Sequence, residues 1–391
     1  MRRPRIDEKV TRAGNGKPTE TKGKEMVNVT KSALPPLEEY VAYLREIWDT
    51  RWMTNDGKFV RLLEERLRQY LGARNMVLVN NGTSAMHLAS RAIKLKGEVI
   101  TTPFTFAATT NVLLWEGLIP VFADIDPETF NINPADVEEK ITNKTCAILA
   151  VHVYGNPCNV GRLQKIANEH NLKLIYDGAH AFGVEHEKRP ITEYGDITTL
   201  SFHATKVFNT IEGGAIVAKD EKMVEKLKLL RNHGIKSEEE VIVPGTNAKM
   251  NEFQAIMGLC NLKYIDENIR RRKKIYEHYK KGLDGKVKFQ RITASKYNYA
   301  YMPVCFADLK TRDEIYSELV KNGITPRKYF FPLTTDFDYY KKDRVDLVKK
   351  YRLKEASEIS NRVLCLPIYP DLQMSNVDRV IRIIKRKIES E

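Results

Sequence analysis

Between Met76 and about residue 245, short apolar runs alternate with segments of helical periodicity, and this pattern strongly constrains the fold. In order, the apolar runs are MVLV, EVIT, PVFADI, CAILAV, LKLIYD, TTLSF and AIVA. Each run has the length of a buried strand, and longer helical patterns lie between them. Strands that alternate with helices predict an α/β fold whose mostly parallel sheet is flanked by helices and has its ligand chemistry at the carboxyl ends of the strands.

Helical patterns flank this alternating region on both sides. Before it, apolar residues recur at helical spacing from Leu37 to Trp48, and a second helix is expected from Lys58 to Leu71. After it, a long helical pattern runs from Phe253 to Tyr264. The chain closes on a helix with five aliphatic residues on one face: Val377, Val380, Ile381, Ile384 and Ile388.

These patterns divide the chain into three parts. We expect a large cofactor-binding α/β domain over residues 27–245 and a smaller C-terminal α+β domain over residues 246–391. Residues 1–26 are rich in Gly, Lys and Thr and lack periodicity, which predicts a disordered basic extension.

Composition excludes several classes of protein. Of 391 residues, 42% are hydrophobic, which provides for a large core and excludes disordered and collagen-like chains. No apolar run reaches the roughly 18 residues of a spanning helix, and the start MRRPRIDEKV lacks a signal-peptide segment. The five cysteines form no C-x-x-C pair, so neither a disulfide framework nor a metal site is expected. We therefore expect a cytoplasmic protein that does not bind membranes.

The net charge of +13 raises the question of nucleic-acid binding. The basic residues are not gathered in one recognition element, and no homeodomain, zinc-finger or RNP pattern accompanies them. The run Arg270–Lys274 is expected to be a solvated helix face. Attraction of a small phosphorylated substrate explains the same excess of charge, so no nucleic-acid partner is expected.

The segment Asn81-Gly82-Thr83-Ser84-Ala85 follows the first apolar run and opens a helical pattern. Free backbone N–H groups, two hydroxyls and the helix dipole suit a phosphate group at such a turn. An ordinary helix N-cap is the alternative, because Ser and Thr are preferred there. The turn lacks the lysine of a P-loop and the spacing of a dinucleotide fingerprint, which disfavours nucleoside triphosphates and NAD.

Two later strand ends carry candidate catalytic groups. Asp177 ends the run LKLIYD, where a carboxylate faces the ligand side of a parallel sheet or else caps the next turn. His180 close by fits either a ligand or a hydrogen-bonded core histidine. Lys206 follows the strand that ends at Ser201, near a Gly-Gly turn. Partial burial would lower its pKa, and a neutral amine can form a Schiff base; the alternative is a solvent-facing lysine.

The order of these groups along the chain indicates one cofactor. Pyridoxal 5'-phosphate needs a phosphate cup, a group that stacks on its ring, a carboxylate for its pyridine nitrogen and a lysine for its aldehyde. A phosphate turn, an aromatic segment, a strand-end Asp and a strand-end Lys follow in that order.

Seven segments together carry a resemblance to a known family: NGTSA, TTPFTFAATTN, PVFADIDPETFNI, VHVYGNP, YDGAHAFG, SFHATK and EGGA. They resemble the DegT/DnrJ/StrS family of pyridoxal-phosphate nucleotide-sugar aminotransferases, over nearly all of residues 27–390. The segments LPPLEEYVAYLREIWDTRWMTNDG and ITTPFTFAATTNVLLWEG are most similar to the branch that makes dTDP-4-amino-4,6-dideoxyglucose. The resemblance implies a fold type I aminotransferase that forms a homodimer with shared active sites.

The resemblance also implies a role for each candidate residue. Lys206 would anchor the cofactor and carry protons, Asp177 would pair with the pyridine nitrogen, and His180 would lie near the ring. Phe106, which hydropathy alone would assign to the core, would stack on the ring. The phosphate would be held by Gly82, Thr83, Ser84 and Ser201, together with Asn247 of the neighbouring subunit.

The expected reaction transfers the amino group of L-glutamate to C4 of a dTDP-4-keto-6-deoxyglucose-type nucleotide sugar and releases 2-oxoglutarate. Alternatives are amination at C3, another nucleotide sugar, or a basic nucleic-acid-binding or regulatory protein with an idle cofactor fold. A dehydratase of the same family would carry histidine at the position of Lys206. One departure concerns Thr334, where many relatives have histidine after Pro-Leu; the basic extension before Met26 has no family counterpart.

Overall fold

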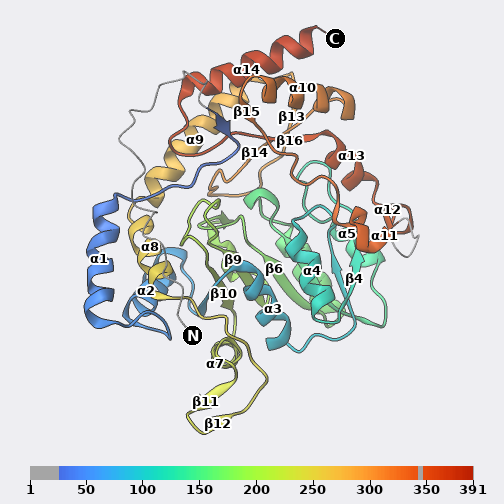
Figure 1. The fold of residues 1–391 in the computed structure, drawn as a ribbon. Helices are drawn as coiled ribbons and strands as arrows, with labels where there is room; N and C mark the ends of the chain where they lie inside the picture. The colour runs from blue at the N-terminus through green and yellow to red at the C-terminus, as the bar shows by residue number, and fades with distance from the viewer. Residues whose placement is uncertain (1–25, 342–346, 391) are drawn as a thin grey trace, which may run out of the picture.

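A seven-stranded sheet lies at the centre of the computed structural model, which describes residues 26–341 and 347–390 (Figure 1). Its strands in spatial order are β2 (Met76–Val79), β10 (Gly214–Ala218), β9 (Ile197–Ser201), β6 (Lys173–Asp177), β5 (Thr145–Val151), β3 (Glu98–Thr101) and β4 (Ile119–Phe122). Strand β10 runs antiparallel to β2 and β9, whereas the other neighbouring pairs are parallel. The predicted mostly parallel sheet is confirmed, and each of the seven apolar runs overlaps one of its strands.

Successive residues of β2 enter two different hydrophobic cores. Met76 and Leu78 pack in the core that contains α2 (Lys58–Leu71) and α8 (Glu252–Leu262). Val77 and Val79 pack in the core of α3 (Gly82–Ala92) and α7 (Glu221–Arg231). Because side chains alternate between the faces of a strand, these contacts place helices on both faces of the sheet.

The remaining elements up to residue 262 connect or cover the strands. The helices are α1 (Leu37–Thr50), α4 (Ala107–Trp115), α5 (Pro134–Glu139) and α6 (Val160–Glu169). Two small hairpins, β7 (Glu185–His186) with β8 (Arg189–Pro190) and β11 (Ile235–Ser237) with β12 (Glu240–Val241), complete this part. Both helices predicted before the sheet are confirmed, with α2 at the expected bounds.

The C-terminal part carries a separate three-stranded antiparallel sheet, β13 (Lys288–Phe289), β14 (Met302–Cys305) and β16 (Val363–Leu366). Its helices are α9 (Ile265–Gly282), α10 (Leu309–Lys321), α11 (Asp338–Lys341), α12 (Leu347–Lys350), α13 (Lys354–Arg362) and α14 (Met374–Glu389). Helix α14 confirms the predicted closing helix and buries Val377, Val380 and Ile384.

The start of the described chain pairs with a strand of the C-terminal part. Strand β1 (Val27–Asn28) lies beside β15 (Ile324–Thr325), so the first described residues join the C-terminal part. The domain division over residues 27–245 and 246–391 stays a prediction, and the expected extension over residues 1–26 lies outside the described residues except for Met26.

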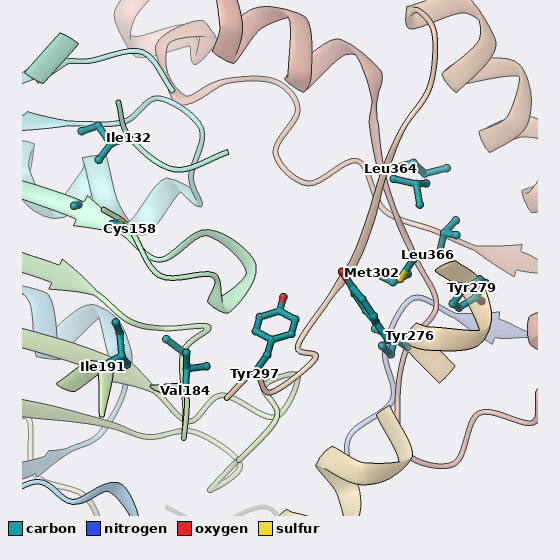
Figure 2. Packing of buried hydrophobic residues seen from close by; sticks show 14 of the residues in the cluster. Ile132, Cys158, Val184, Ile191, Tyr276, Tyr279, Tyr297, Met302, Leu364 and Leu366 are labelled. Atoms are coloured by element: carbon teal, nitrogen blue, oxygen red, sulfur yellow. The ribbon is translucent and has the colours of Figure 1, made fainter. Parts of the chain in front are cut away.

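A hydrophobic cluster joins the central sheet region to the C-terminal part (Figure 2). Figure 2 shows Tyr297 between Val184 on one side and Met302 and Leu366 on the other. The hydroxyl of Tyr297 donates to the carbonyl of Tyr154 at 2.9 Å. This packing fixes the C-terminal part against the edge of the sheet where the strands carry their polar residues.

The basic run on α9 corrects one expectation. Arg270, Arg271, Lys273 and Lys274 are exposed, but Arg272 is buried. Its guanidinium donates to the carbonyls of Ile368 at 3.0 Å and Ala300 at 3.4 Å. The helical period turns this one position toward the core, so the run is a solvated face at four positions only. Among the residues that the structure describes, no helix has the length and apolar content needed to cross a bilayer.

Candidate active site

A cavity of about 620 Å³ opens at the carboxyl ends of β5, β6 and β9, and we call it the main cavity. Its volume lies within the usual range for small-molecule sites. Eight of the nine predicted site residues line it, from four separate segments: Gly82, Thr83, Ser84, Phe106, Asp177, His180, Ser201 and Lys206. The ninth, Asn247, lies elsewhere in this chain.

The segment Asn81–Ser84 is both a helix N-cap and a candidate phosphate site, the two alternatives that its sequence allows. Asn81 caps α3, because its side-chain oxygen accepts from the Ser84 N–H at 2.8 Å. Gly82 and Thr83 occupy the first helical positions, where backbone N–H groups have no partner within the helix. The turn is thus a capped helix start that also faces the main cavity.

Gly82 permits a close contact between this turn and the end of β9. A Cβ atom at Gly82 would lie 2.8 Å from Cβ of Ser201, closer than real side chains approach. Because glycine has no Cβ, the Ser201 hydroxyl and the N-terminus of α3 can face the same point in the cavity.

Asp177 is buried and held from two sides. Its Oδ2 accepts from the Thr109 hydroxyl at 2.9 Å, and its Oδ1 accepts from the Ala179 N–H at 3.0 Å, which is the predicted turn cap. Burial raises the pKa of Asp177 above its ordinary value, while these two hydrogen bonds and Lys206 act in the opposite direction. The carboxyl group therefore lines the cavity in a fixed orientation and would gain from a cationic partner.

His180 is also buried, and its ring lines the main cavity. Its Nδ1 accepts from the backbone N–H of Tyr154 at 3.2 Å. Burial, aided by the positive charge of Lys206, holds the pKa of His180 well below its ordinary value. The ring is therefore neutral and carries its proton on Nε2.

Lys206 lies in the turn between β9 and β10, and its partly buried side chain lines the cavity, so it is not a solvent-facing lysine. Its Nζ lies 3.5 Å from the hydroxyl of Tyr301. Burial lowers the pKa of Lys206 to about 8; the carboxylate of Asp177 opposes this shift and Arg327 adds to it. A substantial neutral fraction near pH 8 makes this amine a nucleophile.

Phe106 begins the turn into α4, and 54% of its surface is exposed. The hydropathy-based assignment of Phe106 to the core is therefore wrong. Its ring lies at the cavity wall with Ala108 and Thr109.

Several cavity residues were not predicted from the sequence, among them Thr109, Tyr301, Arg327 and Tyr329. Thr109 lies in the quoted segment TTPFTFAATTN, so its position one helical turn after Thr105 was the available signal. The other three come from the C-terminal part, and no local motif marks them.

Two further positions lie outside the cavity. Thr334 is fully buried, and its hydroxyl donates to the carbonyl of Pro103 at 3.2 Å. Asn247 is exposed and forms an isolated bridge with Asn232 near the β11–β12 hairpin, which projects from the body of the molecule (Figure 1).

The chemistry of the cavity fits pyridoxal phosphate. A helix start with two hydroxyls and no Cβ at Gly82 suits the phosphate, and the buried carboxylate of Asp177 suits a protonated ring nitrogen. Lys206 offers an amine of lowered pKa in the same cavity.

The fold, together with a lysine, a buried carboxylate and a phosphate-type turn at its strand ends, defines a pyridoxal-phosphate-dependent enzyme of fold type I. Over residues 37–385 the chain matches, and belongs to, the DegT/DnrJ/EryC1/StrS aminotransferase family. It is therefore a pyridoxal-phosphate-dependent sugar aminotransferase.

Three relatives illustrate the similarity. The dTDP-4-amino-4,6-dideoxy-D-glucose transaminase of Shigella dysenteriae is 41% identical over 362 residues, 91% of this chain and 98% of the relative. The crystal structure of DesI with its TDP-sugar product has a TM-score of 0.86 and 33% identity, covering 94% of both chains. NtdA of Bacillus subtilis with bound PMP has a TM-score of 0.83 and 29% identity, covering 90% of this chain and 82% of NtdA.

Proposed function

We propose that this enzyme transfers the amino group of L-glutamate to C4 of dTDP-4-keto-6-deoxyglucose, giving dTDP-4-amino-4,6-dideoxyglucose and 2-oxoglutarate. The main support for this proposal is that Lys206, with its lowered pKa, and the buried carboxylate of Asp177 line one cavity of about 620 Å³. Similarity over 91% of the chain to a transaminase named for that product supports the choice of sugar.

In this proposal the phosphate of the cofactor binds at Gly82, Thr83, Ser84 and Ser201, where the helix start and hydroxyls face the cavity. Phe106 covers the ring from the cavity wall. When bound, pyridoxal phosphate supplies an electron sink for the negative charge that develops at the reacting carbon. Asp177 keeps the ring nitrogen protonated through a charge-assisted hydrogen bond, and Thr109 holds that carboxylate in place.

Lys206 has two tasks in this scheme. Its amine would anchor the cofactor, and the same amine would move a proton at Cα of the donor. The lowered pKa of about 8 allows the amine to accept a proton near neutral pH and to release it again. A proton transfer of this kind typically contributes about 10²–10⁴ in rate. His180, neutral with its proton on Nε2, would offer a hydrogen-bond donor beside the ring without adding charge.

The proposal includes a homodimer with shared active sites. Asn247 is exposed, lies outside the main cavity of its own chain and sits beside a projecting hairpin. In a two-fold dimer such a residue can reach the cofactor phosphate of the other subunit. Each cavity would then be completed by one residue from its partner.

The test is a product analysis. The purified protein is incubated with L-glutamate and dTDP-4-keto-6-deoxyglucose, the sugar product is identified by NMR, and 2-oxoglutarate is quantified. We expect an amine at C4 and one 2-oxoglutarate per amino sugar, with Lys206→Ala as the inactive control. An amine at C3, or turnover only with another nucleotide sugar, would contradict the proposed substrate.

A further inference from the structure

Arg327 lines the main cavity from the C-terminal part, and the proposed cofactor residues do not include it. Its backbone is fixed on both sides: its N–H donates to the carbonyl of Cys365 at 3.1 Å, and its carbonyl accepts from the Cys365 N–H at 2.8 Å. Its guanidinium lies 4.4 Å from the ring centre of Tyr329, a cation–π contact. The charge is therefore held in one place before any ligand binds.

The positive charge of Arg327 has no acidic partner among the described residues: within residues 26–341 and 347–390, no Asp or Glu oxygen forms an ion pair with it. The two acidic residues of the cavity are engaged elsewhere: Asp177 by Thr109 and Ala179, and Glu212 by His203 at 3.4 Å. Arg327 instead interacts with another cation, because its charge helps to lower the pKa of Lys206. Two neighbouring cationic groups in a cavity favour an anionic ligand.

The cofactor phosphate is not the anion that binds Arg327, because its proposed cup lies at the start of α3 and the end of β9. The amino donor can supply that anion. Its amine must reach the position that the Lys206 amine occupies, so its carboxylates lie a few bonds away from that point. Of the substrates in the proposed reaction, the donor is the one that carries carboxylates close to its reacting nitrogen.

We infer that Arg327 binds a carboxylate of the amino donor and thereby positions the donor amine beside Lys206. The identification of that donor as L-glutamate rests on the proposed function. A guanidinium matches a carboxylate through two parallel N–H···O bonds, which sets direction as well as affinity. Arg327 would therefore be a substrate-binding residue for the first half of the reaction.

The first test measures binding without turnover. Glutarate, a dicarboxylate with no amine, is titrated calorimetrically into the holoenzyme and its Arg327→Gln and Arg327→Lys variants. Loss of a paired charge predicts a Kd about 30- to 100-fold weaker for Arg327→Gln and an intermediate value for Arg327→Lys, which keeps the charge without the fork. Arg291→Gln, at an exposed position outside the cavity, is the matched control and should bind as wild type.

The second test separates the two half-reactions. For Arg327→Gln we expect kcat/KM of the L-glutamate half-reaction to fall about 100-fold, and that of the keto-sugar half-reaction to change less than about threefold. An unchanged glutarate Kd, or equal losses in both half-reactions, would overturn the inference. Glutarate binding and 2-oxoglutarate formation require no sugar, so a wrong proposed sugar would leave both readouts of Arg327 intact. Circular dichroism of each variant verifies folding. If Arg327→Gln does not fold, the same comparisons are made between Arg327→Lys and wild type.

Discussion

The Nζ atom of Lys206 lies 3.5 Å from the hydroxyl of Tyr301, a residue 95 positions further along the chain. Burial raises the pKa of Tyr301 above its ordinary value, so the hydroxyl stays neutral and its oxygen can accept from the lysine ammonium. The contact joins the central sheet to the C-terminal part at the point where the chemistry is expected.

The pH dependence of Lys206 follows from its surroundings. Because its pKa is lowered to about 8, the neutral amine accumulates as pH rises from 7 to 9, below the range of an ordinary lysine. We expect acetylation of Lys206 in cofactor-free protein, followed by mass spectrometry, to have a midpoint near pH 8. In Tyr301→Phe the ammonium loses its acceptor, so the midpoint should fall by about half a unit. A midpoint for Lys206 at the ordinary lysine value of about 10.4 would contradict the prediction.

Asp177→Asn removes the negative charge that we assign to the ring nitrogen of the cofactor. An amide cannot stabilise a protonated ring as a carboxylate does, so kcat should fall at least about 100-fold, with a shifted absorption spectrum and modest loss of cofactor. Thr109→Val is the matched control: it keeps the carboxylate but removes one of its hydrogen bonds, and we expect a loss of only about tenfold. An unchanged spectrum and rate in Asp177→Asn would restrict Asp177 to its turn-capping role.

Gly82→Ala tests the close approach of α3 to β9. The new Cβ would lie 2.8 Å from Cβ of Ser201, so one element must shift, and we expect a stability loss of about 1–3 kcal/mol with weaker cofactor binding. Gly161→Ala is the control, since nothing lies within 4 Å of its Cβ, and in α6 it should be neutral or stabilising by up to about 1 kcal/mol. Thermal unfolding with and without added cofactor measures both effects. Equal behaviour of the two variants would count against the proposed cup.

A mixture of two inactive variants tests the shared site. Lys206→Ala abolishes proton transfer, and Asn247→Asp sets a carboxylate beside the phosphate of the partner's cofactor, where like charges repel. Each homodimer should be nearly inactive. Unfolded and refolded together, half of the dimers should be mixed with one intact site each, so about a quarter of wild-type activity should return. If a tagged pull-down detects mixed dimers but no activity returns, Asn247 acts within its own chain.

The sequence alone specifies the central sheet and the order of the candidate cofactor-binding residues along the chain. The seven apolar runs locate its strands, because a strand buried on both faces must be apolar throughout. Asp177 and Ser201 follow from the same pattern, since the carboxyl ends of parallel strands meet at one edge. These signals are local and need only a few neighbouring residues.

The tertiary structure decides what a local pattern cannot contain. Tyr301, Arg327 and Tyr329 reach the cavity because the C-terminal part packs against the sheet through Tyr297, and their own segments carry no motif that predicts it. Burial likewise sets the pKa values of Lys206 and His180, and burial depends on residues far away in the chain. Hydropathy would bury Phe106, but its ring is exposed at the cavity wall. Hydropathy would expose Arg272, but it is buried because its guanidinium donates hydrogen bonds to two backbone carbonyls. Sequence pattern therefore determined the scaffold, whereas long-range packing determined the charges and contacts of the site.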